Sequence, residues 1–371
     1  MITNFNQLKN WYGFLQTIET ALQKFSAHQA LAGKHCQMRE NTLTKPIESL
    51  GRLEQLSHWF YHTRGIYDNL PPEKLITKVL VFAGNHGVAA NQVSAFPAIV
   101  TEAMVKNFET NGAAINQLAK WAKTKLEIIP MNNLLANQNF ANKQKPTPAL
   151  NQQEFCTAIN IGFQAIDKTY HAIVLGEMGI ANSTAAAAIC HCLYGGNIKH
   201  WVGRGTGIDD HILTNKQQAV KIGVKQYQKL YGNKKGLITL QFFGGFEMAA
   251  IAGAIIAGLY HHIPIILDSY TTIACLACLA PHFQNPNIML AGIMTPHRPA
   301  DNRQTKTLYQ GHKLLLNHLN KTPPVNLLVD LNMRLGEGTD GVIALQLLKA
   351  ALACHHGMAT FDSAKIANKI L

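Results

Sequence analysis

The feature that most constrains the fold is an alternation of short apolar segments with longer helical ones from residue 78 onward. The short segments are "KVLVFAG" (78–84), "LEIIPM" (126–131), "HAIVLG" (171–176), "IPIILD" (263–268) and "NIMLAG" (287–292). The helical stretches between them include 101–123, 152–168, 181–193, 214–231 and 246–261. This alternation is typical of parallel strands joined by crossover helices. The sequence therefore predicts an α/β fold with a doubly wound, mostly parallel, Rossmann-like sheet.

The two ends of the chain have helical patterns without such strands. We therefore expect two units. Residues 1–70 and 341–371 would form a small helical lobe, and residues 71–340 a large α/β nucleotide-binding catalytic domain.

The composition is that of a folded protein with a sizeable core, because 47% of the 371 residues are apolar and 15% are charged. The 33 Lys and Arg outnumber the 21 Asp and Glu, which gives a net charge of +12. The lysines are scattered, which favours a solvated basic surface or attraction of a small anionic substrate over nucleic-acid binding. The most apolar run, 248–260, is too short to span a bilayer. The start of the chain is typical of an amphipathic helix and not of a signal peptide. We expect a cytoplasmic protein with neither a nucleic-acid nor a membrane partner.

The cysteines and histidines do not predict a disulfide framework or a metal site. The seven cysteines are odd in number. Cys275 and Cys278 form a C-x-x-C pair, but their Ala, Leu and Ile neighbours favour core packing over a redox or zinc role. Two histidine pairs also lack companions at metal-ligand spacing, which favours surface or packing roles: His261-His262 and His355-His356.

Polar residues follow three of the expected strands, at 84–87, 176–184 and 268–272. Ligands gather at the carboxyl ends of strands in open α/β sheets. The second stretch, "GEMGIANST", places Glu177 before Asn182 and Ser183 at the start of an alanine-rich helix. Free N–H groups at a helix start bind anions, but Asn182 or Ser183 would also serve as a simple helix cap. The motif alone leaves both interpretations open.

A second glycine-rich turn, "VGRGTGIDD", covers residues 202–210. Gly203, Gly205 and Gly207 alternate around Arg204, and successive backbone amides there could bind an anion with help from Lys216. The stretch is not a Walker A loop. As a bare pattern it favours a structural loop.

The segment "MRLGEGTDGVIAL" (333–345) contains the spacing G-x-G-x-x-G at Gly336, Gly338 and Gly341. A dinucleotide-binding turn needs a second strand ending in an acid. Only 30 residues follow Gly341, and they have a helical pattern. The dinucleotide hypothesis, and with it a dehydrogenase, is therefore disfavoured. A carboxylate among glycines, here Glu337, suits general-base chemistry on a loop that approaches a ligand closely.

Eight blocks spread over most of the chain resemble, in order, the nicotinate-nucleotide:dimethylbenzimidazole phosphoribosyltransferase family of cobalamin lower-ligand synthesis. The blocks lie at 43–56, 81–88, 100–119, 176–184, 202–210, 244–255, 263–270 and 333–339. Enzymes of this family join an azole nitrogen of dimethylbenzimidazole to C1′ of nicotinate mononucleotide with inversion. Nicotinate leaves and α-ribazole 5′-phosphate is formed.

The resemblance implies a homodimer that uses these small-molecule substrates without a metal or redox cofactor. It implies that Glu337 is the catalytic base. The residues it places at the nucleotide are Glu177, Gly179, Asn182, Ser183, Gly203, Gly205 and Lys216, the last three at the phosphate. The residues it places around the azole are Phe96, Met104, Met178 and Leu335.

The chain departs from the family pattern at several positions. Asn85 stands where relatives commonly have Asp, and Asp340 replaces a usual glycine and could raise the pKa of Glu337. Phe96 and Met104 stand where relatives can carry Ser and Gln, which leaves open whether the base is dimethylbenzimidazole, another benzimidazole, adenine or a phenol. The segment 295–313 is longer than the family's turn. These departures support one alternative, a non-catalytic nucleotide-binding or sensing relative, in which Glu337 would have no obvious role.

Overall fold

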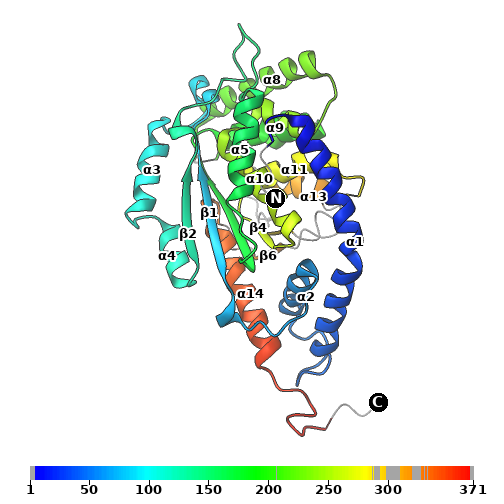
Figure 1. Cartoon of the computed structure of the whole chain (residues 1–371). Helices are drawn as coiled ribbons and strands as arrows, with labels where there is room; N and C mark the ends of the chain where they lie inside the picture. Colours follow the sequence, from blue (N-terminus) through cyan, green and yellow to red (C-terminus); the bar gives the residue numbers. More distant parts are fainter. Residues whose placement is uncertain are drawn as a thin grey trace.

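The computed structural model describes residues 5–205, 207–285, 287, 293–297, 310–319, 327–329, 331 and 333–367 (Figure 1). Within these residues, six parallel strands form one sheet in the order β2-β1-β3-β4-β5-β6. The strands are β1 (Thr77–Ala83), β2 (Lys125–Pro130), β3 (Ala172–Met178), β4 (Ile265–Leu267), β5 (Ile293–His297) and β6 (Leu327–Val329). The predicted α/β fold with a doubly wound parallel sheet is confirmed.

The strand order places the topological switch point between β1 and β3. The chain passes from β1 outward to β2, then crosses back to β3 and continues to β6 on the other side. Crossovers that leave in opposite directions open a crevice at the carboxyl ends of the two strands at the switch point, here β1 and β3. Ala83 pairs with Met178 in this register, and the N–H of Gly84 donates to the carbonyl of Met178 over 2.9 Å. The turns that follow β1 and β3 therefore start side by side.

Helices cover both faces of the sheet (Figure 1). The α-helices in chain order are α1 (Leu8–Glu40), α2 (Arg52–Arg64), α3 (Ile99–Glu109), α4 (Ala114–Trp121), α5 (Gln152–Gln164), α6 (Asn182–Tyr194), α7 (Ile198–Trp201), α8 (Asp210–Tyr231), α9 (Leu237–Phe243), α10 (Phe246–His261), α11 (Tyr270–Leu279), α13 (Gln310–Leu319) and α14 (Thr339–Gly357). Short 3₁₀ turns are η1 (Pro72–Lys74), η2 (Gly87–Asn91), η3 (Asn132–Leu134) and η4 (Ala280–His282).

A hydrophobic core lies on each face of the sheet, because successive side chains of a strand point to opposite faces. Leu80 and Phe82 of β1 face a core shared with α5, α10 and α11. Val79 and Val81 point to the opposite face, into a core shared with α2 and α14. Successive side chains of a strand lie on opposite faces, so a strand buried on both sides is apolar throughout. This explains why "KVLVF" is an uninterrupted apolar run after its lysine.

The long helix α1 joins both cores. Trp11 and Leu15, near its start, pack in the first core, whereas Ala32 and Cys36, near its end, pack in the second core beside α2. Helix α14 begins on the sheet, with Val342 in the same core as the β1 valines, and also packs against α2. The predicted division into a terminal helical lobe and a catalytic domain stays a prediction.

Two expected elements differ from the structure or lie outside its described part. The stretch 101–123 forms two helices, α3 and α4, because Asn111 takes a left-handed φ of 63° between them. The expected strand 287–292 lies outside the described residues except for Asn287, and β5 begins just after it. Most of the segment 295–313 lies outside them as well.

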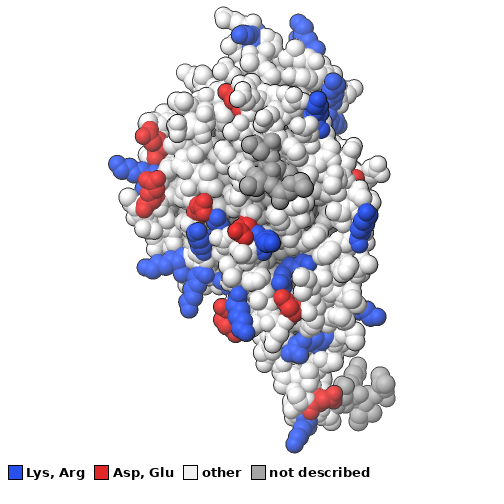
Figure 2. Space-filling view, in the orientation of Figure 1, with Lys and Arg blue, Asp and Glu red and all other residues white. Residues whose placement is uncertain are grey.

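Charged side chains are spread widely over the face drawn in Figure 2, with Asp and Glu among the Lys and Arg. Within the described residues, none of the helices has the length and apolar character needed to cross a membrane.

Candidate active site

Glu337 lies on a tight loop that connects to the start of α14. Gly336, Glu337 and Gly338 have successive φ values of 80°, 62° and 90°, all in the left-handed region. Glycine adopts this region readily, but a non-glycine residue such as Glu337 is strained there by about 1–3 kcal/mol. The loop rests on β3: a Cβ added at Gly176 would lie 2.4 Å from the nitrogen of Gly338. Gly336 and Gly338 allow the sharp turn, and the missing side chain of Gly176 lets the loop lie directly against β3, so the Glu337 carboxylate is held at the edge of the sheet.

Asp268, the residue after β4, anchors this loop. Its Oδ2 accepts the N–H of Gly338 over 2.9 Å, and its Oδ1 accepts the N–H of Gly341 over 2.8 Å. Gly338 is the N-cap residue of α14 and has no side chain with which to cap the helix. Burial raises the pKa of Asp268 to about 6 although these N–H groups favour the charged form. The sequence predicted a polar strand end at 268–272 but no role for Asp268; the available signal was a carboxylate directly after a strand.

The side chain of Glu337 is almost completely buried, with 5% of its surface exposed. Burial and the negative charge of Asp268 raise the pKa of Glu337 to about 7. The sequence pointed to Asp340 as the neighbouring charge, whereas in the structure the charge that raises this pKa is that of Asp268. Burial and the same charge raise the pKa of Asp340 itself to about 8.

Glu177, the penultimate residue of β3, also lies beside this loop. Its Oε1 accepts from the hydroxyl of Ser269 over 2.9 Å, and its Oε2 accepts from the amide of Asn182. A Cβ added at Gly336 would lie 3.1 Å from Glu177 Oε1 and 3.9 Å from Asp268 Oδ2. Burial raises the pKa of Glu177 to about 8, opposed by the Ser269 hydrogen bond and assisted by the charge of Asp268. Ser269 was not predicted from the sequence.

The start of α6 links Glu177 to a buried cation. Asn182 binds Glu177, and the next residue, Ser183, accepts a hydrogen bond from Nζ of Lys216 over 2.8 Å. Lys216 lies on α8 with 3% of its surface exposed, and burial lowers its pKa to about 8.

The glycine-rich turn at 202–210 reaches the same cation, although Thr206 lies outside the described residues. Lys216 also donates to the carbonyl of Gly203 over 3.3 Å. A Cβ added at Gly205, whose φ is 52°, would lie 3.4 Å from the Ser183 hydroxyl and 3.5 Å from Lys216 Nζ. The two glycine-rich segments, 176–184 and 202–210, therefore converge on one lysine of α8.

Gly179 completes the set of residues expected at the nucleotide. A Cβ there would lie 2.5 Å from the carbonyl oxygen of Gly84, so the turns after β1 and β3 touch through their backbones. All seven residues of this set lie at the carboxyl edge of β3 or on the segments that converge on it.

The four residues expected around the azole are less tightly grouped. Met104 on α3 and Met178 at the end of β3 are half-buried against the second core. Phe96, before α3, and Leu335, before Gly336, expose 48% and 55% of their surfaces.

The turn after β1 holds two further polar contacts. The amide of Asn85 donates to the carbonyl of Leu134 over 2.8 Å, a bond that an ionised Asp could not make. Nε2 of His86 lies 2.5 Å from Oε1 of Glu247 on α10, and both side chains are buried. This pair was not predictable from the sequence, because 161 positions separate the two residues.

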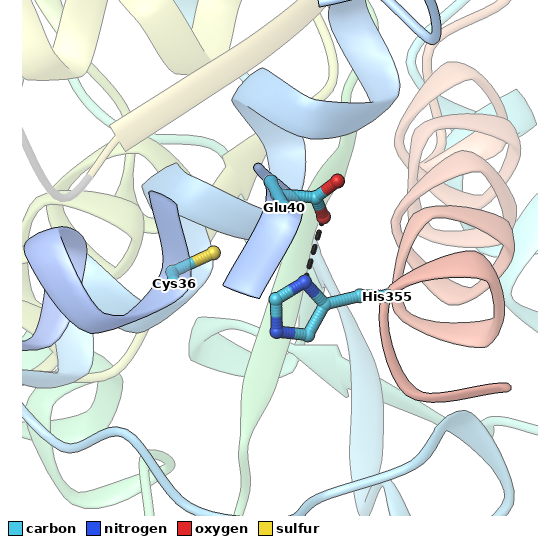
Figure 3. Close-up of side chains that lie close together, drawn as sticks. All are labelled: Cys36, Glu40 and His355. Atoms are coloured by element: carbon cyan, nitrogen blue, oxygen red, sulfur yellow. Dashed lines mark hydrogen bonds and ion pairs between the residues drawn. The ribbon is translucent and has the colours of Figure 1, made fainter. Parts of the chain in front are cut away.

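The C-x-x-C pair packs in the core as predicted, since Cys275 and Cys278 are fully buried with free thiols. Within the described part of the chain, one group of three possible metal-ligating side chains comes together: Cys36, Glu40 and His355 (Figure 3).

The polar atoms of His355 and Glu40 already have hydrogen-bond or ion-pair partners within the protein. Nδ1 of His355 lies 2.6 Å from Oε1 of Glu40, and its Nε2 lies 3.0 Å from the hydroxyl of Tyr67. Lys45 supplies a buried cation 3.2 Å from Oε2 of Glu40. Burial and the nearby carboxylates raise the pKa of Cys36 to about 12, which keeps its thiol neutral. The cluster is best described as a buried network in which the Glu40–His355 hydrogen bond fastens α1 to α14 and the Lys45–Glu40 ion pair supports it.

Known proteins share this chain's sequence and fold over nearly its whole length. A family model described as "Phosphoribosyltransferase" matches residues 26–366. The nicotinate-nucleotide–dimethylbenzimidazole phosphoribosyltransferase of Ruegeria sp. (strain TM1040) is 41% identical over 355 residues, which cover 95% of this chain and 98% of that protein. The protein of the same name from Ruegeria pomeroyi is 42% identical over 339 residues, which cover 91% and 93%.

A solved structure agrees with the sequence relatives. The crystal structure of CobT from Thermus thermophilus superimposes with a TM-score of 0.76 at 30% identity, and the match covers 91% of this chain and 99% of that one. The chain belongs to the nicotinate-nucleotide–dimethylbenzimidazole phosphoribosyltransferase family.

Proposed function

We propose that this protein transfers the phosphoribosyl group of nicotinate mononucleotide to 5,6-dimethylbenzimidazole or a related azole. The products are nicotinate and α-ribazole 5′-phosphate, for the nucleotide loop of cobalamin. The observation that carries the proposal is the buried carboxyl of Glu337 on a glycine-flanked loop beside Glu177. The partner of Glu177, Asn182, directly precedes Ser183, which binds Lys216. The name and near-complete coverage of the Ruegeria relatives support it.

The chemistry needs one base. A bond forms between an azole nitrogen and C1′, and the bond from C1′ to the pyridinium nitrogen breaks with its electron pair going to nicotinate. The leaving nitrogen departs neutral and needs no proton. The second azole nitrogen loses its proton, which Glu337 would accept. Because burial and Asp268 raise the pKa of Glu337 to about 7, it is a stronger base than an ordinary carboxylate and is still ionised in part near neutral pH.

The nucleotide would occupy the carboxyl edge of β3. Glu177, Gly179, Asn182 and Ser183 would line it, with Gly203, Gly205 and Lys216 at its phosphate. A phosphate would favour the charged form of Lys216 and replace the contact that its ammonium now makes with Ser183. A phosphate needs close approach of backbone amides, which the left-handed glycine at 205 permits.

The azole would cover apolar surface on Phe96, Met104, Met178 and Leu335. The large exposed fractions of Phe96 and Leu335 support this placement, since burial of apolar surface contributes about 25 cal/mol per Å². A methionine and a phenylalanine in place of polar residues favour a hydrophobic base.

The direct test is incubation of the purified protein with nicotinate mononucleotide and dimethylbenzimidazole, followed by chromatography with mass detection. We expect nicotinate and α-ribazole phosphate in equal amounts. Mononucleotide binding without product from any base in a panel of benzimidazoles, purines and phenols would instead support a binding or sensing protein. The homodimer implied by the resemblance and the cytoplasmic location expected from the sequence pattern stay predictions, and light scattering of the purified protein tests the first.

A further inference from the structure

We propose that Asp268 is the positioning residue for this reaction: its carboxylate clamps the loop that presents Glu337 and thereby sets where the azole proton is accepted. The inference rests on the proposed role of Glu337.

The clamp closes across the junction of the loop with α14. One carboxylate oxygen of Asp268 accepts the N–H of Gly338, at the end of the left-handed segment. The other accepts the N–H of Gly341, in the first turn of the helix. Carboxylates are favoured at helix N-termini, where N–H groups lack partners within the helix. Asp268 thus supplies from the end of β4 the cap that Gly338 cannot provide.

The loop depends on such a clamp because its backbone is not relaxed. Glu337 is a non-glycine residue at a φ of 62°, a conformation that persists only where the surroundings enforce it. The contact inside the segment, from the Thr339 hydroxyl to the carbonyl of Gly336 over 2.8 Å, closes the turn without tying it to the sheet. Asp268 makes that tie.

The loop that carries Glu337 is closely packed, so a change in the position of its backbone would also move the Glu337 carboxylate. A Cβ at Gly176 would lie 2.6 Å from the carbonyl carbon of Glu337. The side chains of Glu177 and Asp268 also lie close to Gly336. A displacement of about 1 Å between reacting groups lowers rates by as much as about a hundredfold. Loss of the clamp would therefore act on turnover.

The Asp268 carboxylate also acts on Glu337 through its charge. This effect can be measured in the pH profile of the reaction, which a purely structural role of Asp268 would not change. The charge of Asp268 helps to raise the pKa of Glu337 to about 7. Removing this charge therefore lowers the pKa of Glu337, and the acid limb of the pH profile of kcat/KM moves to lower pH.

Two substitutions separate position from charge. Asp268→Asn removes the charge and offers one oxygen instead of two. Asp268→Glu keeps the charge but moves the carboxylate by one methylene. We expect each to lower kcat about 10- to 100-fold with the mononucleotide Kd changed less than about threefold, because Lys216 and its partners are untouched. We expect the acid limb to move to lower pH in Asp268→Asn alone.

Glu73→Gln is the control, because Glu73 is an exposed carboxyl on the short turn η1 and makes no contact with the loop that carries Glu337 among the hydrogen bonds and ion pairs of the described residues. Its kcat and acid limb should stay close to those of the unsubstituted protein. An unchanged kcat in Asp268→Glu would overturn the inference. So would an Asp268→Asn variant in which both kcat and the acid limb are unchanged. If Asp268→Asn does not fold, the kcat of Asp268→Glu decides. Failure of the proposed function is distinguishable, since the unsubstituted protein would then form no product.

Discussion

Lys216 and Ser183 are joined by a hydrogen bond of 2.8 Å that ties α8 to the first turn of α6. The ammonium is buried, and within the described residues the groups that it contacts are neutral oxygens of Ser183 and Gly203. An uncompensated buried cation is costly. A bound anion would relieve this cost.

Lys216→Ala is expected to weaken binding of nicotinate mononucleotide about 10- to 100-fold, the equivalent of one charge-assisted hydrogen bond of about 1.5–3 kcal/mol. Titration calorimetry measures the change. Lys221→Ala, an exposed lysine on the same helix, serves as the control. An unchanged Kd in Lys216→Ala would show that the phosphate lies elsewhere.

Glu337→Gln is expected to lower kcat about 10²- to 10⁴-fold, because glutamine cannot accept the azole proton. The mononucleotide should bind as before, since Glu337 is not among its proposed contacts. Turnover near that of the unsubstituted protein would refute the assignment of the base, whereas loss of nucleotide binding would show that the loop also supports the nucleotide site.

The pH dependence of kcat/KM is expected to be bell-shaped. Glu337 must be ionised, so the rate rises with pH through its pKa of about 7. Lys216 must be charged, so the rate falls as pH rises through its pKa of about 8. Loss of the acid limb in Glu337→Gln and of the alkaline limb in Lys216→Ala would assign each limb. Limbs that persist in these variants would belong to other groups.

Gly176→Ala is expected to lower turnover by pushing the loop off the sheet, since a Cβ there would lie 2.4 Å from the nitrogen of Gly338. Gly13→Ala is the control: it lies inside α1, and an added Cβ meets nothing within 4 Å. This control should be neutral or stabilising by about 0.5–1 kcal/mol. Full activity in Gly176→Ala would show that the loop tolerates displacement.

Glu40→Gln is expected to lower the free energy of unfolding by about 3–5 kcal/mol at about pH 7, because it breaks a buried ion-pair network. Burial alone would raise the pKa of Glu40, but His355 and Lys45 outweigh burial and lower it. A carboxyl whose pKa is lowered by folding stabilises the fold at pH values above its pKa in the unfolded chain, about 4.3 for Glu. This contribution is lost as the pH falls through the pKa of Glu40 in the folded protein.

Chemical denaturation near neutral pH and at about pH 3 checks this prediction. The difference between Glu40→Gln and the unsubstituted protein should shrink at the lower pH, while Glu109→Gln, an exposed carboxylate, changes little at either pH. A difference that is the same at both values would mean that packing, and not charge, explains the loss.

The outline of the sheet was predictable because the strands β1, β3 and β4 are buried on both faces. Each of β1, β3 and β4 is an apolar run next to a helical stretch, and such runs are recognisable without any contact information. The break between α3 and α4 was harder to predict, since it depends on the backbone of Asn111 and not on a change in hydrophobic period.

The sequence by itself determined the fold class, the family resemblance and Glu337 as the candidate base, because these depend on residue types at local spacing. Only the tertiary structure decided what acts on Glu337. Asp268 precedes Gly338 by 70 positions, and Ser269 follows Glu177 by 92. Hydrogen bonds and charge effects depend on distances in space, which the order of strands in the sheet sets and which local spacing does not contain.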